Sequence, residues 1–119
     1  MQGVLEGLRV LDLGSQVAGP FCARLLADYG AEVIKVEPPR VGDESRRMGP
    51  FVGDDPHPEK SIPFLYINTN KRGITLDIAT ETGKEILAVL LRRADVLVEN
   101  FPPAEAEALG LDYPTLYQI

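Results

Sequence analysis

The sequence has one cysteine, one histidine and no apolar run near 18 residues in a length of 119. Because Cys22 has no second cysteine and no metal-ligating companion, it can form neither an internal disulfide nor a metal site, and we expect it to pack within a helix. His57 lies between Pro56 and Pro58 in an irregular segment with no partner to orient it. We therefore expect a surface histidine rather than a general base.

The chain also lacks a long apolar segment and an excess of basic residues. No basic leader precedes an apolar signal segment, so a cytoplasmic protein without a membrane partner is expected. The net charge of −6 argues against nucleic-acid binding, which needs a basic surface. The length and the 45% hydrophobic content give room for one domain, residues 1–119, with a real core.

The charges are unevenly distributed along the chain. Residues 35–72 carry seven basic and six acidic side chains, whereas the remaining residues carry five basic and twelve acidic ones. A polyphosphate ligand would therefore be attracted to the middle segment rather than to the ends. Solvated loop charges would account for the same composition.

Residues 7–37 have the pattern of a strand, a helix and a second strand with very short connections. The apolar segments 8–13 and 32–37 predict buried parallel strands. The helix between them is predicted to open at Gly19 and Pro20 and to end at Gly30. Its expected packing face consists of Phe21, Cys22, Leu25, Leu26 and Tyr29.

The rest of the chain predicts further short elements. Residues 40–63 are rich in Gly, Pro, Asp and Arg and indicate a long ordered loop or lid. Segments 64–67 and 74–78 predict strands on either side of a polar turn, and a helix follows from Thr80 or from Thr82, which has capping-box spacing to Glu85. A strand at 95–99 and a helix at 104–109 come next, and a last helix starts at 113 and runs on unfinished.

Together these elements predict an α/β fold with an open, mainly parallel, Rossmann-like sheet flanked by helices. In such sheets a ligand lies beyond the carboxyl ends of the strands, which places a site at residues 14–19. This loop reads GSQVAG, with Gln16 where a dinucleotide fingerprint has its middle glycine, and Pro20 follows Gly19 where a P-loop has lysine. Glu37 stands where a ribose-binding acid would be, but the glycine pattern argues against an NAD site.

Several motifs follow one another along nearly the whole chain. They are LDL at 11–13, AGP at 18–20, LAD at 26–28, GAEVIKVE at 30–37, GD at 42–43, NKR at 70–72, LD at 76–77, ADVLVENF at 94–101 and LGL at 109–111. In this order and spacing they resemble the N-terminal portion of the family III CoA-transferases. That family includes formyl-CoA and carnitine CoA-transferases and the related α-methylacyl-CoA racemases.

The resemblance implies an acyl-CoA site. Coenzyme A and acyl-CoA would be substrates rather than permanently bound cofactors, and a carboxylic acid would be the acceptor. The loop matching residues 15–18 would lie against the thioester, with Gln16 as its polar contact, and segments 76–79 and 100–102 would line the adenine and pantetheine path. For Asn100, closing the turn after a strand is the structural alternative. The cofactor-binding residues implied are Gln16, Val17, Ala18, Arg40, Leu76, Asn100, Phe101 and Pro102.

Three positions depart from the pattern of the better-known transferases. Pro38, Ala79 and Ala108 stand where those proteins often have Arg, Lys and Arg, and the loss of such charges removes contacts to phosphate or adenine. Arg40 is the expected substitute for the first of them. Four other basic residues are further candidates to compensate: Arg46, Arg47, Lys71 and Arg72.

The resemblance also implies that the catalytic residue lies outside this chain. In the family an aspartate carries the acyl group as a mixed anhydride, and none of the aspartates 12, 28, 43 and 77 matches its motif. We therefore expect no catalytic residue here and no activity from this chain alone. A fragment of an acyl-CoA racemase or isomerase and a non-catalytic acyl-CoA-binding or interaction module are the alternatives. Family members form interlocked homodimers, so a homodimer is expected.

Overall fold

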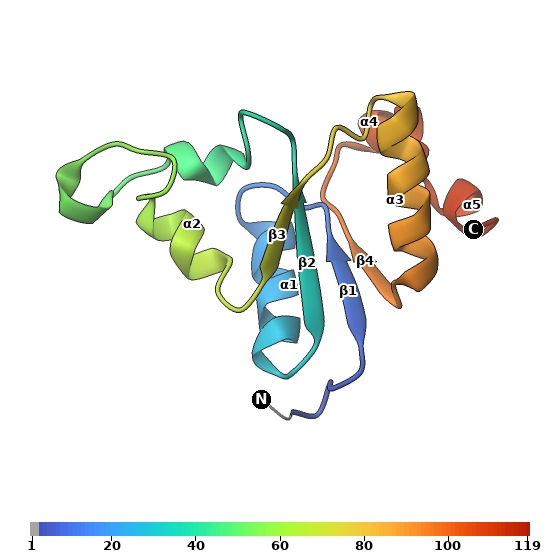
Figure 1. The fold of residues 1–119 in the computed structure, drawn as a ribbon, viewed down its shortest axis with the longest axis horizontal. Coiled ribbons are helices and arrows are strands. Elements are labelled where there is room, and N and C mark those ends of the chain that lie inside the picture. The colour runs from blue at the N-terminus through green and yellow to red at the C-terminus, as the bar shows by residue number, and fades with distance from the viewer. Residues whose placement is uncertain (1–2) are drawn as a thin grey trace.

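The structure is a computed structural model that describes residues 3–119. Four strands form one parallel sheet in the order β3-β2-β1-β4, which confirms the α/β prediction (Figure 1). The strands are β1 Arg9–Asp12, β2 Glu32–Glu37, β3 Arg72–Thr75 and β4 Val96–Val98. In the register of the sheet, Leu11 of β1 lies between Ile34 of β2 and Leu97 of β4.

Alternating side chains of the strands build two cores, one on each face of the sheet. Val10 and Val33 pack toward helix α1 (Ala18–Asp28). Leu11 and Val36 pack on the other face, where helix α3 (Glu81–Arg93) and helix α4 (Pro103–Ala108) cover them. The sheet is therefore sandwiched between helices, and the carboxyl ends of its strands all open at one edge (Figure 1).

Helix α1 packs on the sheet through its small residues, Gly19, Pro20, Ala23 and Ala27. The predicted packing face was largely wrong: Phe21, Leu25 and Tyr29 are exposed, and so is Cys22. The small side chains let the helix backbone approach the sheet closely, so the larger apolar ones turn outward. Of the predicted set, Leu26 does pack against the core.

The segment 40–63 carries two short 3₁₀ helices, η1 (Glu44–Arg47) and η2 (Val52–Asp54), and a β-bridge joins Phe51 to Ser61. It extends from the carboxyl edge of the sheet to one side of the molecule (Figure 1). The strand predicted at 64–67 was wrong, because these residues belong to helix α2 (Ile62–Ile67). The Ser61 hydroxyl accepts a hydrogen bond from the Phe64 N–H at 3.2 Å and caps this helix. A short apolar run does not by itself distinguish strand from helix.

From β3 onward, the structure differs from prediction only at the boundaries of the elements. Strand β3 begins at Arg72, two residues before the predicted start at 74. The cap of α3 is Thr80, whose hydroxyl accepts from the Gly83 N–H at 3.0 Å. Of the two predicted starts, Thr80 is therefore confirmed and the Thr82 capping box was wrong. The last helix, α5 (Tyr113–Leu116), ends within the chain, so it does not run on unfinished. No helix within residues 3–119 is long and apolar enough to cross a membrane.

Candidate functional site

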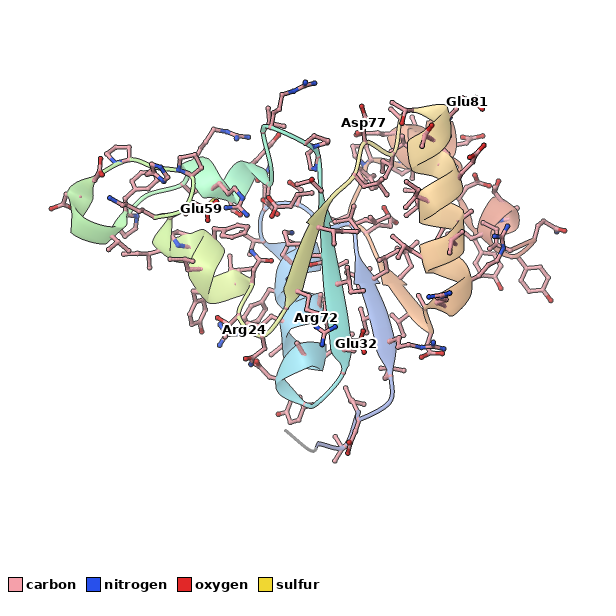
Figure 2. The ribbon with its side chains drawn as sticks, viewed as in Figure 1. Arg24, Glu32, Glu59, Arg72, Asp77 and Glu81 are labelled. Carbon is pink, nitrogen blue, oxygen red and sulfur yellow. The ribbon has the colours of Figure 1, made fainter. Side chains whose placement is uncertain are left out.

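A cleft of about 810 Å³ lies at the carboxyl edge of the sheet, where a ligand site was predicted from the sequence. Figure 2 orients it: Asp77, on the cleft wall, lies at the opposite end of the strands from Arg72 and Glu32. Segments that follow all four strands contribute to the lining. They are residues 13–18, 36–38, 41–44 and 47, 76–79, and 100–102 with 105 and 109.

Seven of the eight predicted cofactor-binding residues line this cleft: Gln16, Val17, Ala18, Leu76, Asn100, Phe101 and Pro102. The eighth, Arg40, does not. It is exposed in the turn after Pro38 and Pro39, with a left-handed backbone φ of 68°, and that turn carries its side chain outside the cleft. The proposed substitution of Arg40 for the missing charge at position 38 therefore lacks support from the geometry.

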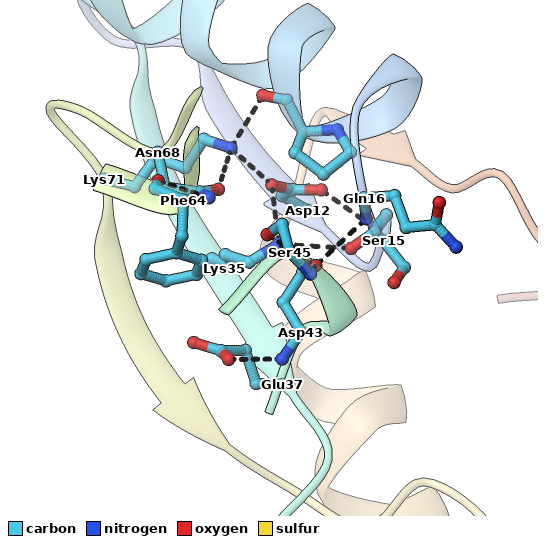
Figure 3. Close-up of polar contacts among 12 residues, drawn as sticks. Asp12, Ser15, Gln16, Lys35, Glu37, Asp43, Ser45, Phe64, Asn68 and Lys71 are labelled. Carbon is cyan, nitrogen blue, oxygen red and sulfur yellow. Dashed lines mark hydrogen bonds and ion pairs between the residues drawn. The ribbon is translucent and has the colours of Figure 1, made fainter. Parts of the chain in front are cut away.

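The loop 14–16 at the centre of the cleft is fixed by side chains that bond its backbone (Figure 3). Asp12 Oδ1 accepts from the Gly14 N–H at 2.8 Å, and Lys35 Nζ donates to the Gly14 carbonyl at 3.1 Å. Asp43 Oδ1 accepts from the Gln16 N–H at 3.0 Å. Both ends of the loop are therefore tied to buried charged groups, and the loop is preformed before any ligand binds.

Asn100 holds the middle of the same loop. Its Oδ1 accepts from the Ser15 N–H at 2.8 Å, and its Nδ2 donates to the Ser15 carbonyl at 2.9 Å. The turn after β4 is closed instead by Glu99, which accepts from the Phe101 N–H at 2.8 Å. Asn100 thus has a structural role, but in joining two walls of the cleft rather than in closing its own turn.

A balanced cluster of two lysines and two aspartates lies beneath the loop (Figure 3). Lys71 Nζ is 2.8 Å from Asp12 Oδ2, and Lys35 Nζ is 2.7 Å from Asp43 Oδ2. All four side chains are almost fully buried, so each charge needs its partner. Burial would raise the pKa of Asp43, but hydrogen bonds from Lys35 and Ser45 outweigh it and hold that pKa below its usual value. Burial lowers the pKa of Lys71, and Asp12 partly offsets this.

The carboxylate of Glu37, at the end of β2, forms an ion pair with Arg46. The guanidinium makes two hydrogen bonds of 2.7 Å to the carboxylate, and Glu37 Oε2 also accepts from the Asp43 N–H at 2.7 Å. Burial alone would raise the pKa of Glu37, but these bonds outweigh it and lower that pKa. Glu37 therefore anchors segment 40–63 to the sheet and is not available to a ribose.

The other basic candidates lie apart from the cleft, with one exception. Arg46 is committed to Glu37, Lys71 is buried against Asp12, and Arg72 lies at the amino edge of the sheet. Arg47 lines the cleft, where it donates to the Val41 carbonyl at 3.0 Å. Within residues 3–119 it is the one cation among the lining residues.

Asp77, in the predicted segment 76–79, lines the cleft, and so do two acidic residues that the sequence did not single out, Glu44 and Glu105. Asp77 Oδ1 accepts from the Ala79 N–H at 3.1 Å, and Glu44 accepts from the side chain of Gln16 at 2.6 Å. Within the described chain, no three His, Cys, Asp or Glu residues are grouped as metal ligands would be. A signal for the buried part of the site was present in the sequence, because Lys35 interrupts the apolar run from Val33 to Val36 and so needs an acidic partner.

A parallel α/β sheet with a preformed loop and a cleft at its carboxyl edge is a Rossmann-like arrangement. A sequence profile described as CoA-transferase family III matches residues 5–119. The chain therefore belongs to CoA-transferase family III.

Relatives with similar sequences and structures are longer than this chain. The formyl-CoA:oxalate CoA-transferase of Bradyrhizobium sp. (strain ORS 278) is 44% identical over 119 residues, which cover 100% of this chain and 27% of that protein. The succinyl-CoA:mesaconate CoA-transferase of Haloarcula hispanica is 45% identical over 114 residues, 96% of this chain and 28% of its own. A crystal structure of a CAIB/BAIF family protein from Brucella suis matches with a TM-score of 0.87 and 41% identity, covering 99% of this chain and 31% of that one. The chain thus spans less than a third of each.

Proposed function

We propose that this chain is the N-terminal, CoA-binding domain of an enzyme that moves CoA between an acyl-CoA donor and a carboxylic acid acceptor. The relatives are named for that class of reaction, with formyl-CoA and oxalate or succinyl-CoA and mesaconate as the pairs. The observation that carries the proposal is the convergence of seven family-matched residues on one cleft at the carboxyl edge of the sheet.

The walls of the cleft suit the pantetheine arm of CoA. Leu76, Ile78 and Phe101 supply apolar surface, and Asn100 supplies an amide beside it. A flexible, mostly apolar arm with two amide groups is held best by such a trough with a few polar partners. The side chain of Gln16, on the preformed loop, would face the thioester.

For the phosphate groups of CoA the cleft offers one cation, Arg47, and the acidic residues Glu44, Asp77 and Glu105 are also among its lining residues. We therefore propose that this chain supplies the pantetheine and thioester part of the site, and that most phosphate contacts come from the rest of the protein. Binding of CoA to this chain should then depend only weakly on salt.

The nucleophile of the proposed reaction, an aspartate that forms an acyl anhydride, would lie outside this chain. Asp12 and Asp43 are buried in ion pairs, and a carboxylate locked in this way cannot attack a thioester. Asp77 caps the turn before α3. This chain alone is therefore expected to bind acyl-CoA without transferring CoA, and cytoplasmic location and homodimer formation remain predictions from the sequence and the family.

Isothermal calorimetry with CoA and with acetyl-CoA, at low and at moderate salt, tests the proposal. Saturable binding of both ligands at one site per chain is expected, together with no CoA transfer to added oxalate or formate. Absence of binding by either ligand would overturn the proposal for this chain and favour a structural or interaction module. CoA transfer by this chain alone would overturn the assignment of the nucleophile.

A further inference from the structure

The side chain of Gln16 is held by a residue that the family resemblance did not include. Gln16 Nε2 donates to Glu44 Oε2 at 2.6 Å, a short, charge-assisted hydrogen bond. The Gln16 backbone N–H donates to Asp43, the neighbour of Glu44, at 3.0 Å. Two consecutive residues therefore fix both the main chain and the carboxamide of Gln16.

Asp43, the neighbour of Glu44 in the chain, is held in place by several buried contacts. Asp43 is 3% exposed and forms an ion pair of 2.7 Å with Lys35. Its Oδ1 also accepts from the N–H and the hydroxyl of Ser45, each at 2.8 Å, which fixes the start of η1. Gln16 in turn has a left-handed φ of 65°, a conformation that a residue with a side chain keeps only when its surroundings hold it.

The contact with Glu44 fixes the direction of the carboxamide. A carboxylate only accepts hydrogen bonds, so the amide nitrogen of Gln16, and not its oxygen, faces Glu44. Within residues 3–119 the structure gives this side chain no other hydrogen bond, so one N–H and the oxygen are left for a ligand. Both residues line the cleft.

We propose that Glu44 is a positioning residue, which orients Gln16 so that its second N–H donates to the carbonyl oxygen of a bound acyl thioester. Glu44 itself cannot bind that oxygen, because two acceptors repel each other, so it acts through Gln16. The inference rests on the proposed function. It adds that the site favours acyl-CoA over free CoA, whose thiol has no carbonyl to accept the bond.

The test is a double-mutant cycle on the ratio of the acetyl-CoA and CoA affinities, measured by calorimetry. The unchanged chain should bind acetyl-CoA more tightly than CoA. Q16A and E44A should each reduce the ratio by about two- to tenfold, the value of one hydrogen bond, and the double variant should lose no more than Q16A alone. E44Q should keep most of the ratio, because its amide oxygen can still accept from Gln16.

The control is E105Q, which removes a charge of the same cleft at a residue whose side chain has no hydrogen bond to Gln16. This change should alter both affinities by the same factor and leave the ratio unchanged. Additive losses in the cycle, an unchanged ratio in E44A, or an equal loss in E105Q would each overturn the role of Glu44. All these variants are at exposed positions, so their folding is expected to be intact.

A second measurement tests the contact without any ligand. The side-chain amide signals of Gln16 in a ¹H–¹⁵N spectrum, assigned by their loss in Q16A, should shift in E44A and not in E105Q. Signals that do not move in E44A would overturn the proposal whether or not the chain binds CoA. A chain that binds neither ligand would overturn the proposed function, whereas binding of both with an unchanged E44A ratio would overturn only the role of Glu44.

Discussion

Arg46 donates two hydrogen bonds of 2.7 Å to the carboxylate of Glu37, and this contact connects segment 40–63 to the end of strand β2. The same guanidinium lies 3.8 Å from the ring centre of Phe64, on helix α2. One side chain therefore joins the sheet, the 3₁₀ helix η1 and helix α2. The preformed shape of the cleft depends on these contacts of Arg46, because Glu44 of η1 and its cap Asp43 bond to Gln16.

Replacing Arg46 with alanine should destabilise the chain more than replacing its neighbour. The Glu37 carboxylate is 8% exposed and would be left without its partner, which should lower the free energy of unfolding by about 2–3 kcal/mol. R47A is the matched control, and its effect should stay within about 0.5 kcal/mol because Arg47 is exposed. Urea unfolding followed by circular dichroism measures both. Equal losses in the two variants would contradict the role of Arg46.

Low pH should lower the free energy of unfolding by protonating the buried carboxylates of Glu37 and Asp43. The pKa values of Glu37 and Asp43 lie below their usual values of 4.5 and 3.8, so both carboxylates hold protons more weakly in the folded chain than in the unfolded one. Their stabilising contribution is complete above these usual values and is lost as the pH falls through the lower folded values.

The measurement is the free energy of unfolding of the unchanged chain and of E37Q at a series of pH values from neutral to below the usual pKa of Glu37. The unchanged chain should lose stability more steeply in the acid range, because E37Q has no carboxylate to protonate at this position. E37Q should be the less stable protein at neutral pH, where it leaves Arg46 without an ion pair. Parallel curves would show that Glu37 does not contribute.

Strands β1, β2 and β4 and the position of the cleft could be predicted from the sequence, because buried parallel strands are apolar runs and ligands bind at their carboxyl ends. The burial face of α1 could not be predicted from its apolar residues. Ala23 and Ala27 pack on the sheet because they are small, and this choice depends on how closely helix and sheet approach, which no periodicity records. Residues 64–67 could not be assigned from their apolar pattern either, because the Ser61 cap stabilises a helix there.

The polar part of the site was predicted only in outline. The family resemblance pointed to the cleft residues Gln16 and Asn100, but their bonds to Glu44 and Ser15 join positions far apart in the sequence. Arg40 shows the reverse case. Its position after β2 suggested a phosphate contact, but the turn made by Pro38 and Pro39 carries it outside the cleft. The direction of a turn follows from its dihedral angles, which composition does not specify.

Arg47 and Arg40 should therefore differ in their effect on CoA binding. R47A removes the cation of the cleft and should weaken CoA binding by about three- to tenfold at low salt, with a smaller effect at moderate salt because exposed charges are screened. R40A removes a charge outside the cleft and should leave the dissociation constant unchanged. Calorimetric titration with CoA measures both. The opposite order would return Arg40 to the site and remove Arg47 from it.

Asn100 should be needed for the order of the loop rather than for the stability of the fold. N100A removes both bonds to Ser15, and N100D removes the donor and places a carboxylate against the Ser15 carbonyl, so N100D should be the more harmful change. Hydrogen exchange should show faster exchange of the Ser15 amide in both variants. The amides of β2 serve as the internal control and should keep their protection. Equal protection of Ser15 in all three proteins would contradict this role.

Helices α1 and α2 contact each other, and their surface carries five apolar side chains that are 37–61% exposed: Phe21, Leu25, Ile62, Leu65 and Tyr66. Large contiguous apolar surfaces mark sites of association, so the chain should self-associate in solution. L65E should shift it toward the monomer by adding a charge to that surface. V89E is the matched control, because Val89 on α3 has the same 46% exposure but lies on the other face of the sheet. Multi-angle light scattering over a range of concentrations measures the mass. A monomeric unchanged chain, or equal effects of L65E and V89E, would contradict an association surface on α1 and α2.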